Sequence, residues 1–402
     1  MLTLAIALAT PSFFMNIPRQ DDWTIVPIME NILEGRAVFA DFWTPHSEHR
    51  LLVPRFILSH WAAWTRWDLR GVPWLDLVLV LMGTAWVASL AGKNKFFWVA
   101  ASFTFSLSAI KAVNWPTILN TFLSASLAVG ALVCISHRPK SFKRWAMAVP
   151  LAVISTFSFG SGVAVWPAAL PLIVAAHKSP RFGAIAALWT GSAVLCMAFY
   201  FNGMDLQNHP SIFISIQKIG NTALFFIVYL GALFYPLPAE FFGVLGLILS
   251  TALCVDTARR VNREVEFGIT GLLSVVLFVL VTAFLTALAR SRFGADYATA
   301  ERYLPISSYL WAALSVWLVL LSQAKPNPFI RPILITLLGS ILLIAPLHWW
   351  SFEDIKTSMN SAVLILKKEP PNPSELLGLY EEPGVTLRGL AILKERKFSI
   401  FK

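Results

Sequence analysis

Residues 267–290 read FGITGLLSVVLFVLVTAFLTALAR, and the only charged side chain in this stretch is Arg290 at its end. A helix that crosses the hydrocarbon core of a bilayer needs roughly 17–25 mostly apolar residues, so the stretch predicts a transmembrane helix. Further crossings are predicted by hydropathy on both sides of it. They lie at about 2–17, 72–91, 96–112, 117–136, 145–159, 162–177, 182–201, 239–256, 304–323 and 328–346. We therefore expect an all-α polytopic membrane protein with about 11 transmembrane helices.

The composition excludes several other classes of protein. Hydrophobic residues make up 57% of the 402 residues and charged residues only 13%, against roughly 45–50% and 25% in soluble domains. This excess argues against a soluble enzyme, a disordered chain and a small secreted domain. The three cysteines, Cys134, Cys196 and Cys254, lie inside apolar stretches without metal-ligand spacing, so we expect them in the core.

Basic side chains predict the orientation in the membrane. If the chain starts inside and residues 216–235 do not cross, the inside loops hold 13 basic and 3 acidic side chains, which accounts for the whole net charge of +10. The charge therefore indicates topology rather than a nucleic-acid partner. A crossing by residues 216–235 would make 12 helices and move Arg259 and Arg260 outside. We expect this segment to be re-entrant or to lie in the membrane interface.

Two long polar regions fall outside in this arrangement, residues 18–71 after the first crossing and residues 347–402. The second contains Pro370-Pro371 and Pro383-Gly384, which predict short helices between turns. The expected organisation is a transmembrane domain over residues 1–346, including the first outer loop, followed by an outer tail over residues 347–402.

The first outer loop opens with Asp21-Asp22. Apolar residues at helical spacing follow and predict a surface helix that ends near Gly35, with its apolar face down on the membrane. A second amphipathic helix, from about Leu51 to Trp67, carries Arg55. The acidic pair has two readings. It could cap the first helix, or it could supply a base that deprotonates an acceptor hydroxyl at the membrane surface.

The segment His46-Ser47-Glu48-His49-Arg50 is the next dense polar cluster. Three readings stay open for it. His46, Glu48 and His49 are candidates for a divalent metal such as Mg or Mn. The same side chains with Arg50 and Arg55 could bind substrate or phosphate. A purely structural polar cluster is the third reading.

A second outer loop, residues 289–303, contains three arginines on the side where basic residues are unusual. Arg290, Arg292 and Arg302 could simply reach lipid headgroups. Alternatively they form a phosphate clamp, because the planar guanidinium matches phosphate oxygens. Arg302-Tyr303 is the best candidate for that role, with Arg292 or Lys111 assisting.

The sequence resembles the C-type glycosyltransferase (GT-C) superfamily, and looks closest to bacterial members. The resemblance lies in the first loop, from DDW at residues 21–23 to EHR at 48–50 and PR at 54–55. It also lies in the late loop with Arg292, Gly294 and Arg302-Tyr303, and in LGLY and KFSIF of the tail. The middle of the chain is matched only by its helix pattern.

The resemblance implies an integral membrane glycosyltransferase in a bacterial inner membrane, acting at the outer, periplasmic face. It implies a polyprenyl-phosphate-linked sugar as donor, a glycan or lipid-linked acceptor, and contact with membrane lipids. Asp21 or Asp22 takes the place of the catalytic acidic residue, and Arg302 and its neighbours hold the donor phosphate. The alternatives are a flippase or transporter of lipid-linked glycans, and an O-antigen ligase or polymerase.

Overall fold

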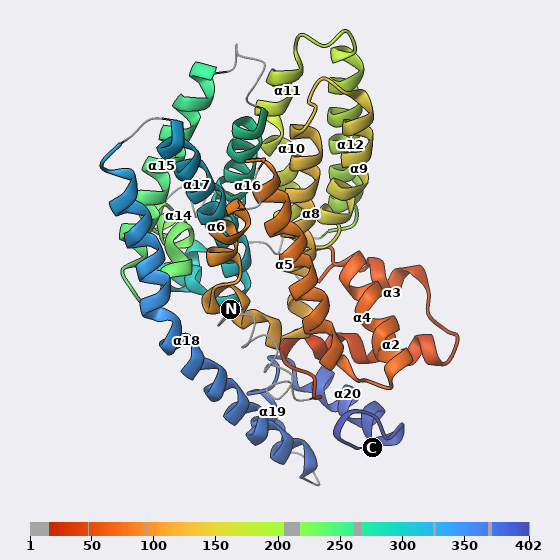
Figure 1. Ribbon diagram of the computed structural model, residues 1–402. Helices are drawn as coiled ribbons and strands as arrows, with labels where there is room; N and C mark the ends of the chain where they lie inside the picture. The colour runs from red at the N-terminus through yellow and green to blue at the C-terminus, as the bar shows by residue number, and fades with distance from the viewer. Residues whose placement is uncertain are drawn as a thin grey trace. The chain divides into compact units, whose positions relative to one another are not determined.

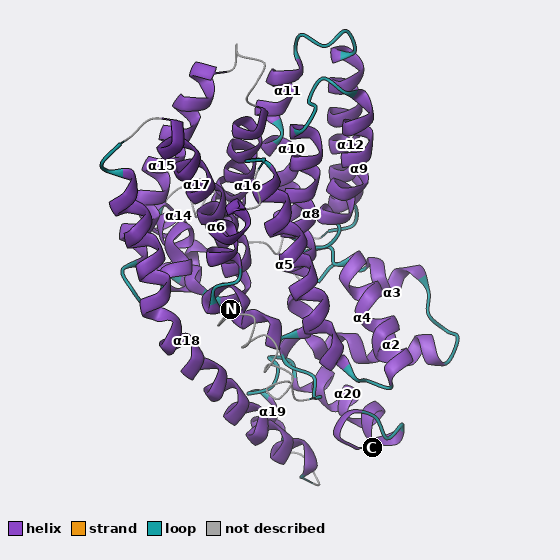
Figure 2. Ribbon diagram, in the orientation of Figure 1, coloured by secondary structure: helices purple, strands orange, loops and turns teal. Residues whose placement is uncertain are grey.

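The computed structural model describes residues 16–46, 48–92, 95–204, 218–260, 267–324, 327–368 and 372–401. Within these ranges the chain is built of helices and loops and contains no strand, as Figure 2 shows. The all-α prediction is therefore confirmed for the described residues. The predicted first crossing at 2–17 lies almost wholly outside them. The chain divides into two compact units: Met1–Leu77, Val113–Asn120 and Pro346–Lys402 form unit 1, and Val78–Ala112 and Thr121–Ala345 form unit 2.

Seven described helices are long and apolar enough to cross a membrane (Figure 1). They contain α5 (Val72–Ser89), α8 (Leu119–Ser136), α12 (Phe182–Phe201), α15 (Ala239–Arg260), α16 (Phe267–Arg290), α17 (Leu304–Ala324) and α18 (Ile330–Lys367). An eighth candidate is the pair α6 (Lys95–Thr104) and α7 (Leu107–Ile110), bent by 55°. The protein is thus polytopic, and these eight positions agree with predicted crossings.

The predicted total of 11 crossings is not confirmed, because two more of the predicted segments form short helices and the segment 2–17 lies almost wholly outside the described residues. The segment 145–159 lies in α9 (Phe142–Thr156), which contains Pro150. The segment 162–177 is divided among η6 (Gly160–Ala164), α10 (Val165–Ala168) and α11 (Leu170–Ala176). Proline inside a helical stretch removes a backbone donor and interrupts the helix, and residues 160–171 contain two glycines and two prolines.

The segment 216–235, expected not to cross, forms α14 (Ile219–Gly231) and η7 (Ala232–Phe234). Thirteen residues of α-helix span about 20 Å at 1.5 Å per residue. That length is shorter than the hydrocarbon core of about 30 Å. The non-spanning placement stays a prediction that this length supports.

In unit 1 the two predicted helices of the first loop are confirmed as α2 (Ile25–Leu33) and α4 (Leu52–Thr65). Gly35 follows α2 with φ +67°, a conformation that glycine adopts without strain. The loop also contains η2 (Gln20–Thr24), α3 (Phe39–Trp43) and η3 (Leu69–Gly71). The prediction of short helices for the whole tail is wrong for residues 347–367, which continue α18. The described remainder of the tail forms the short helices α19 (Pro373–Leu376), α20 (Pro383–Glu395) and η11 (Ser399–Phe401).

The apolar face of α2 packs inside the protein rather than on the membrane. Ile25, Ile28 and Met29 are buried, and α2 contacts both α4 and α20. Figure 1 shows α20 beside α2. The expectation that this face lies down on the bilayer is therefore wrong, because the tail and α4 cover it.

In unit 2, α14 and α15 approach each other through glycines. A Cβ atom added at Gly243 would lie 1.9 Å from the carbonyl oxygen of Ile227, and one added at Gly231 would lie 1.9 Å from that of Ala239. These contacts are with backbone atoms, which cannot turn away as a flexible side chain can. Small residues at such crossings let two helix backbones approach closely.

We predict that Gly243→Ala lowers the stability of the protein, because the new methyl group must push α15 away from α14. Overpacking of this kind costs about 1–3 kcal/mol. The matched control is Gly191→Ala in α12, where an added Cβ meets nothing within 4 Å. Thermal unfolding in detergent should show a lower midpoint for the first variant only. Equal midpoints for both variants would contradict the close approach.

Candidate functional site

The acidic pair of the first loop splits into one buried and one accessible carboxylate. Asp22 is fully buried. Its Oδ1 accepts hydrogen bonds from the backbone N–H of Thr117, at 2.9 Å, and from the Thr117 hydroxyl. Its Oδ2 accepts a hydrogen bond of 2.9 Å from the backbone N–H of Arg19. Burial raises the pKa of Asp22 to about 7, against the opposing hydrogen bonds from Thr117 and Arg19.

Asp21 has a different environment. Its side chain is 29% exposed, and its Oδ1 lies 3.5 Å from Nε2 of His46, which is 18% exposed. The two residues are neighbours in η2, a 3₁₀ helix in which successive side chains point about 120° apart. Asp22 is thus buried while Asp21 lies near His46 at the partly exposed side of η2. The hydrogen bond from the Arg19 N–H to Asp22 agrees with the cap reading. The base reading stays a prediction.

The predicted cluster at 46–50 is organised by a tight turn. The backbones of His46 and His49 exchange two hydrogen bonds of 2.8 and 2.9 Å, and Nε2 of His49 lies 3.8 Å from Glu48. Ser47 lies outside the described residues. Among the described side chains, no group of three or more histidine, cysteine or acidic residues is arranged to hold a metal ion. The reading of His46, Glu48 and His49 as metal ligands gains no support from this geometry.

Arg50 and Arg55 are arginines of the first loop that are turned inward. Arg50 is fully buried, with its guanidinium 4.2 Å from the centroid of the Trp43 ring and a hydrogen bond to the Trp43 carbonyl. Arg55 is 7% exposed and donates to the Thr44 carbonyl. This placement favours a role for Arg50 in holding the loop, whereas Arg55 also interacts electrostatically with Asp21.

Two residues near the acidic pair were missed by sequence reasoning. Thr117, in η5 (Pro116–Ile118), holds Asp22 across 95 residues of sequence. Tyr380, in the tail, is 5% exposed and interacts electrostatically with Asp21 and Arg55. No periodicity or spacing marks either residue, although Tyr380 belongs to the tail segment that carries part of the family resemblance.

In unit 2, the late loop forms three short 3₁₀ helices, η8 (Ser291–Phe293), η9 (Ala295–Thr299) and η10 (Glu301–Tyr303). Arg292 is exposed, and its guanidinium lies 4.5 Å from the centroid of the Phe293 ring. Arg302 lies 5.6 Å from that of Tyr297. Aromatic faces attract and orient guanidinium groups while leaving their edges available to other partners.

Lys111 and Tyr303 contribute to the same loop in different ways. Lys111, in η4 (Lys111–Asn114), places Nζ 3.6 Å from the carboxylate of Glu301, next to Arg302. Lys111 thus forms an ion pair with Glu301, and its assistance to Arg302 stays a prediction. Tyr303 is only 4% exposed and packs against Tyr229, with ring centroids 5.2 Å apart. The role of Tyr303 in phosphate binding stays a prediction.

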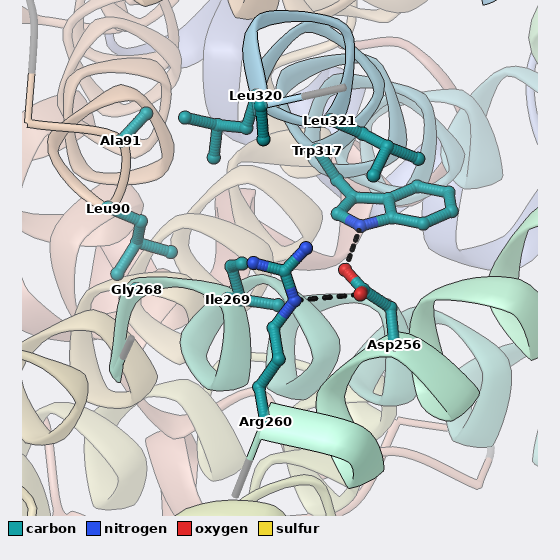
Figure 3. Close-up of a pocket in the computed structure, with 10 residues that line it drawn as sticks. Leu90, Ala91, Asp256, Arg260, Gly268, Ile269, Trp317, Leu320 and Leu321 are labelled. Atoms are coloured by element: carbon teal, nitrogen blue, oxygen red, sulfur yellow. Dashed lines mark hydrogen bonds and ion pairs between the residues drawn. The ribbon is translucent and has the colours of Figure 1, made fainter. Parts of the chain in front are cut away.

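A cavity of about 250 Å³ lies at the other end of the long helices of unit 2 (Figure 3). Asp256 accepts a 2.7 Å hydrogen bond from Arg260 and a 2.9 Å hydrogen bond from the Trp317 indole at its wall. Gly268, near the start of α16, also lines it. The arginines of the late loop follow the opposite end of α16, whose 24 residues span about 36 Å. This cavity is therefore separate from the late-loop arginines.

No protein-family model and no curated protein matches the chain. Two solved structures of oligosaccharyltransferases from Archaeoglobus fulgidus are similar to it. One is the archaeal oligosaccharyltransferase AglB in complex with an inhibitory peptide and a dolichol-phosphate, with 14% identity and a TM-score of 0.46 over 89% of this chain and 55% of that one. The other is the apo form of an oligosaccharyltransferase, with 13% identity and a TM-score of 0.45 over 93% and 59%. The chain spans less than two thirds of the length of either.

We predict that Asp22 makes the stability of the protein depend on pH. Its pKa rises from 3.8 to about 7 on folding, so the folded state holds the proton more tightly than the unfolded state. The contribution of Asp22 to the free energy of unfolding is therefore fully present below pH 4, and is lost as the pH rises to about 7. At roughly 1.4 kcal/mol per pKa unit, the loss is at most about 4 kcal/mol.

The measurement compares apparent melting temperatures of the wild type and Asp22→Asn in detergent between pH 4 and 8. The difference should favour the wild type most at low pH and shrink toward pH 7. Asp68→Asn, at an exposed ion pair with Arg70, is the control and should follow the wild-type profile. A wild-type advantage that grows with rising pH would contradict the direction of the shift.

Proposed function

We propose that the chain is an integral membrane glycosyltransferase. It transfers a sugar from a polyprenyl-phosphate donor to a hydroxyl of a glycan or lipid-linked acceptor at the outer face of a bacterial inner membrane. The observation that carries the proposal is the partly exposed Asp21 carboxylate near His46. The hydrogen bond from Thr117 to the buried Asp22 holds the backbone of this segment. A base fixed in a loop of a polytopic protein suits a donor that lies in the same bilayer.

The proposal assigns one chemical role to the first loop and another to the late loop. In unit 1, Asp21 accepts the proton of the acceptor hydroxyl. The oxygen of that hydroxyl bonds to the anomeric carbon of the donor sugar. The bond from that carbon to the phosphate oxygen breaks with its electron pair, so a single displacement inverts the configuration. In unit 2, Arg302 and Arg292 bind the phosphate and stabilise the charge that it gains, with Lys111 close by. His46 orients Asp21, and Glu48 and His49 lie at the rim of the same turn.

Asp21→Asn is expected to reduce transfer by about 10²- to 10⁴-fold, the usual contribution of a positioned general base. Asp22→Asn should lose activity only in proportion to its loss of folded protein, because Asp22 is buried against Thr117. The measurement is transfer from radiolabelled polyprenyl-phosphate sugars to a membrane glycolipid extract, using purified protein in lipid nanodiscs. Asp68→Asn serves as the matched control. Full activity of Asp21→Asn would overturn the assignment.

Arg302→Lys is expected to raise the KM for the donor by about tenfold or more, because lysine keeps the charge but loses the bidentate fork. The turnover number at saturating donor should change less. Arg331→Lys at the exposed start of α18 is the control for the same chemical change and should leave the donor KM at the wild-type value. A donor KM that is equal in both variants would remove Arg302 from phosphate binding.

A flippase of lipid-linked glycans is the second candidate, and one observation favours it. Asp76 in α5 is fully buried, and neither of its carboxylate oxygens has a hydrogen-bond partner among the described residues. Ionisable residues within membrane helices often mark transport pathways. Movement of labelled sugar-lipid between leaflets of liposomes, lost in Asp76→Asn and kept in Asp21→Asn, would favour this function. An O-antigen ligase or polymerase is the other rival, and it would retain transfer without Asp21.

A further inference from the structure

The backbone next to Asp21 is joined directly to the tail. The N–H of Gln20 donates a 3.2 Å hydrogen bond to the carbonyl of Leu379. Gln20 and Leu379 immediately precede Asp21 and Tyr380 in the sequence. This one bond therefore brings the backbones at Asp21 and Tyr380 together, although about 360 residues separate them.

The tail is held in this place by several further contacts. A Cβ atom added to Gly389 in α20 would lie 2.9 Å from the ring of Trp23, which is fully buried in η2. Arg396 forms an ion pair with Glu34 after α2. The Ser399 hydroxyl donates a hydrogen bond to the Asn16 carbonyl. Contacts on both sides of Asp21 thus fix the tail on the first loop.

The Tyr380 side chain lies within electrostatic range of charged groups of the first loop. Burial is the main cause that raises the pKa of Tyr380 to about 12, and the carboxylate of Asp21 raises it further while the guanidinium of Arg55 opposes this. The pKa of Arg55, lowered to about 10 by burial, is in turn raised by Tyr380 and Asp21. At neutral pH the Tyr380 side chain therefore carries a neutral hydroxyl, which interacts with the Asp21 carboxylate and the Arg55 guanidinium.

We propose that Tyr380 binds the acceptor: the Gln20–Leu379 hydrogen bond holds the tail at Asp21, and the Tyr380 hydroxyl hydrogen-bonds the sugar whose neighbouring hydroxyl Asp21 deprotonates. This inference rests on the proposed function and names the part of the chain that recognises the acceptor. Glu381 and Glu382 follow Tyr380 and act on it electrostatically, so this position disfavours an anionic group. The acceptor recognised here is an uncharged glycan hydroxyl rather than a phosphate.

The test uses Tyr380→Phe, which removes the hydroxyl and keeps the ring. Kinetics are measured with the full chain in nanodiscs, a radiolabelled polyprenyl-phosphate hexose as donor and a glycolipid extract titrated as acceptor. We expect kcat/KM for the acceptor to fall about tenfold, the effect of one lost hydrogen bond of roughly 1.4 kcal/mol. The donor KM should stay unchanged. Tyr200→Phe, at a buried tyrosine of α12, is the matched control and should retain wild-type kinetics.

A second pair of variants tests the tail itself. Gly389→Leu places a side chain against Trp23 and should undock α20, with a loss of acceptor kcat/KM at least as large as that of Tyr380→Phe. Gly384→Leu alters the same helix where an added Cβ meets nothing within 4 Å, and should leave it intact. A Gly389→Leu protein with wild-type acceptor kinetics overturns the proposal.

The outcomes separate this inference from the proposed function. Transfer that needs Asp21 but is unchanged in Tyr380→Phe overturns the role of Tyr380 alone. A joint rise of donor and acceptor KM in Tyr380→Phe also overturns it, because that result indicates a general structural role. Transfer that does not need Asp21 overturns both proposals.

Discussion

The bond between Asp22 and Thr117 is the constraint on which the first loop depends. A buried carboxylate is costly unless it is hydrogen-bonded, and Asp22 meets this requirement with the N–H and hydroxyl of Thr117 and the N–H of Arg19. These bonds fix the rotation of η2. In the helix held this way, Asp21 is partly exposed and Trp23 is buried. A buried carboxylate thereby helps to hold the backbone of its accessible neighbour.

The unusual pKa of Asp22 and the proposed catalysis by Asp21 should not be confused. A strongly shifted carboxyl in a loop rich in histidine and arginine is the usual sign of a catalytic acid or base. Here the shift belongs to the structural member of the pair, because burial causes it. The accessible member is the one with a histidine 3.5 Å away. Accessibility, rather than the size of a pKa shift, identifies the candidate base.

Much of the helical pattern could be predicted from the sequence, because long apolar stretches with few charges have few alternatives in a membrane. α2 and α4 were also predictable from apolar spacing and from Gly35. The short helices at 142–176 were not predicted as such, since the same apolar composition serves a crossing and a buried helix pair. The roles of Asp21 and Asp22 could not be separated, because the partner that distinguishes them, Thr117, is 95 residues away. The burial of Arg50 likewise depends on its contact with Trp43, which residue spacing does not show.

The docking of α20 and η11 on the first loop also determines when this loop can complete its packing during synthesis of the protein. Glu34 emerges from the ribosome early, whereas its partner Arg396 follows 362 residues later. At roughly 5–20 residues per second, that interval is on the order of 20–70 s. During it, the face of α2 that α20 later covers has no partner from the tail. The first loop therefore completes its packing only after the membrane helices have been made, and a chain stopped before residue 383 would lack the α20 and η11 that complete it.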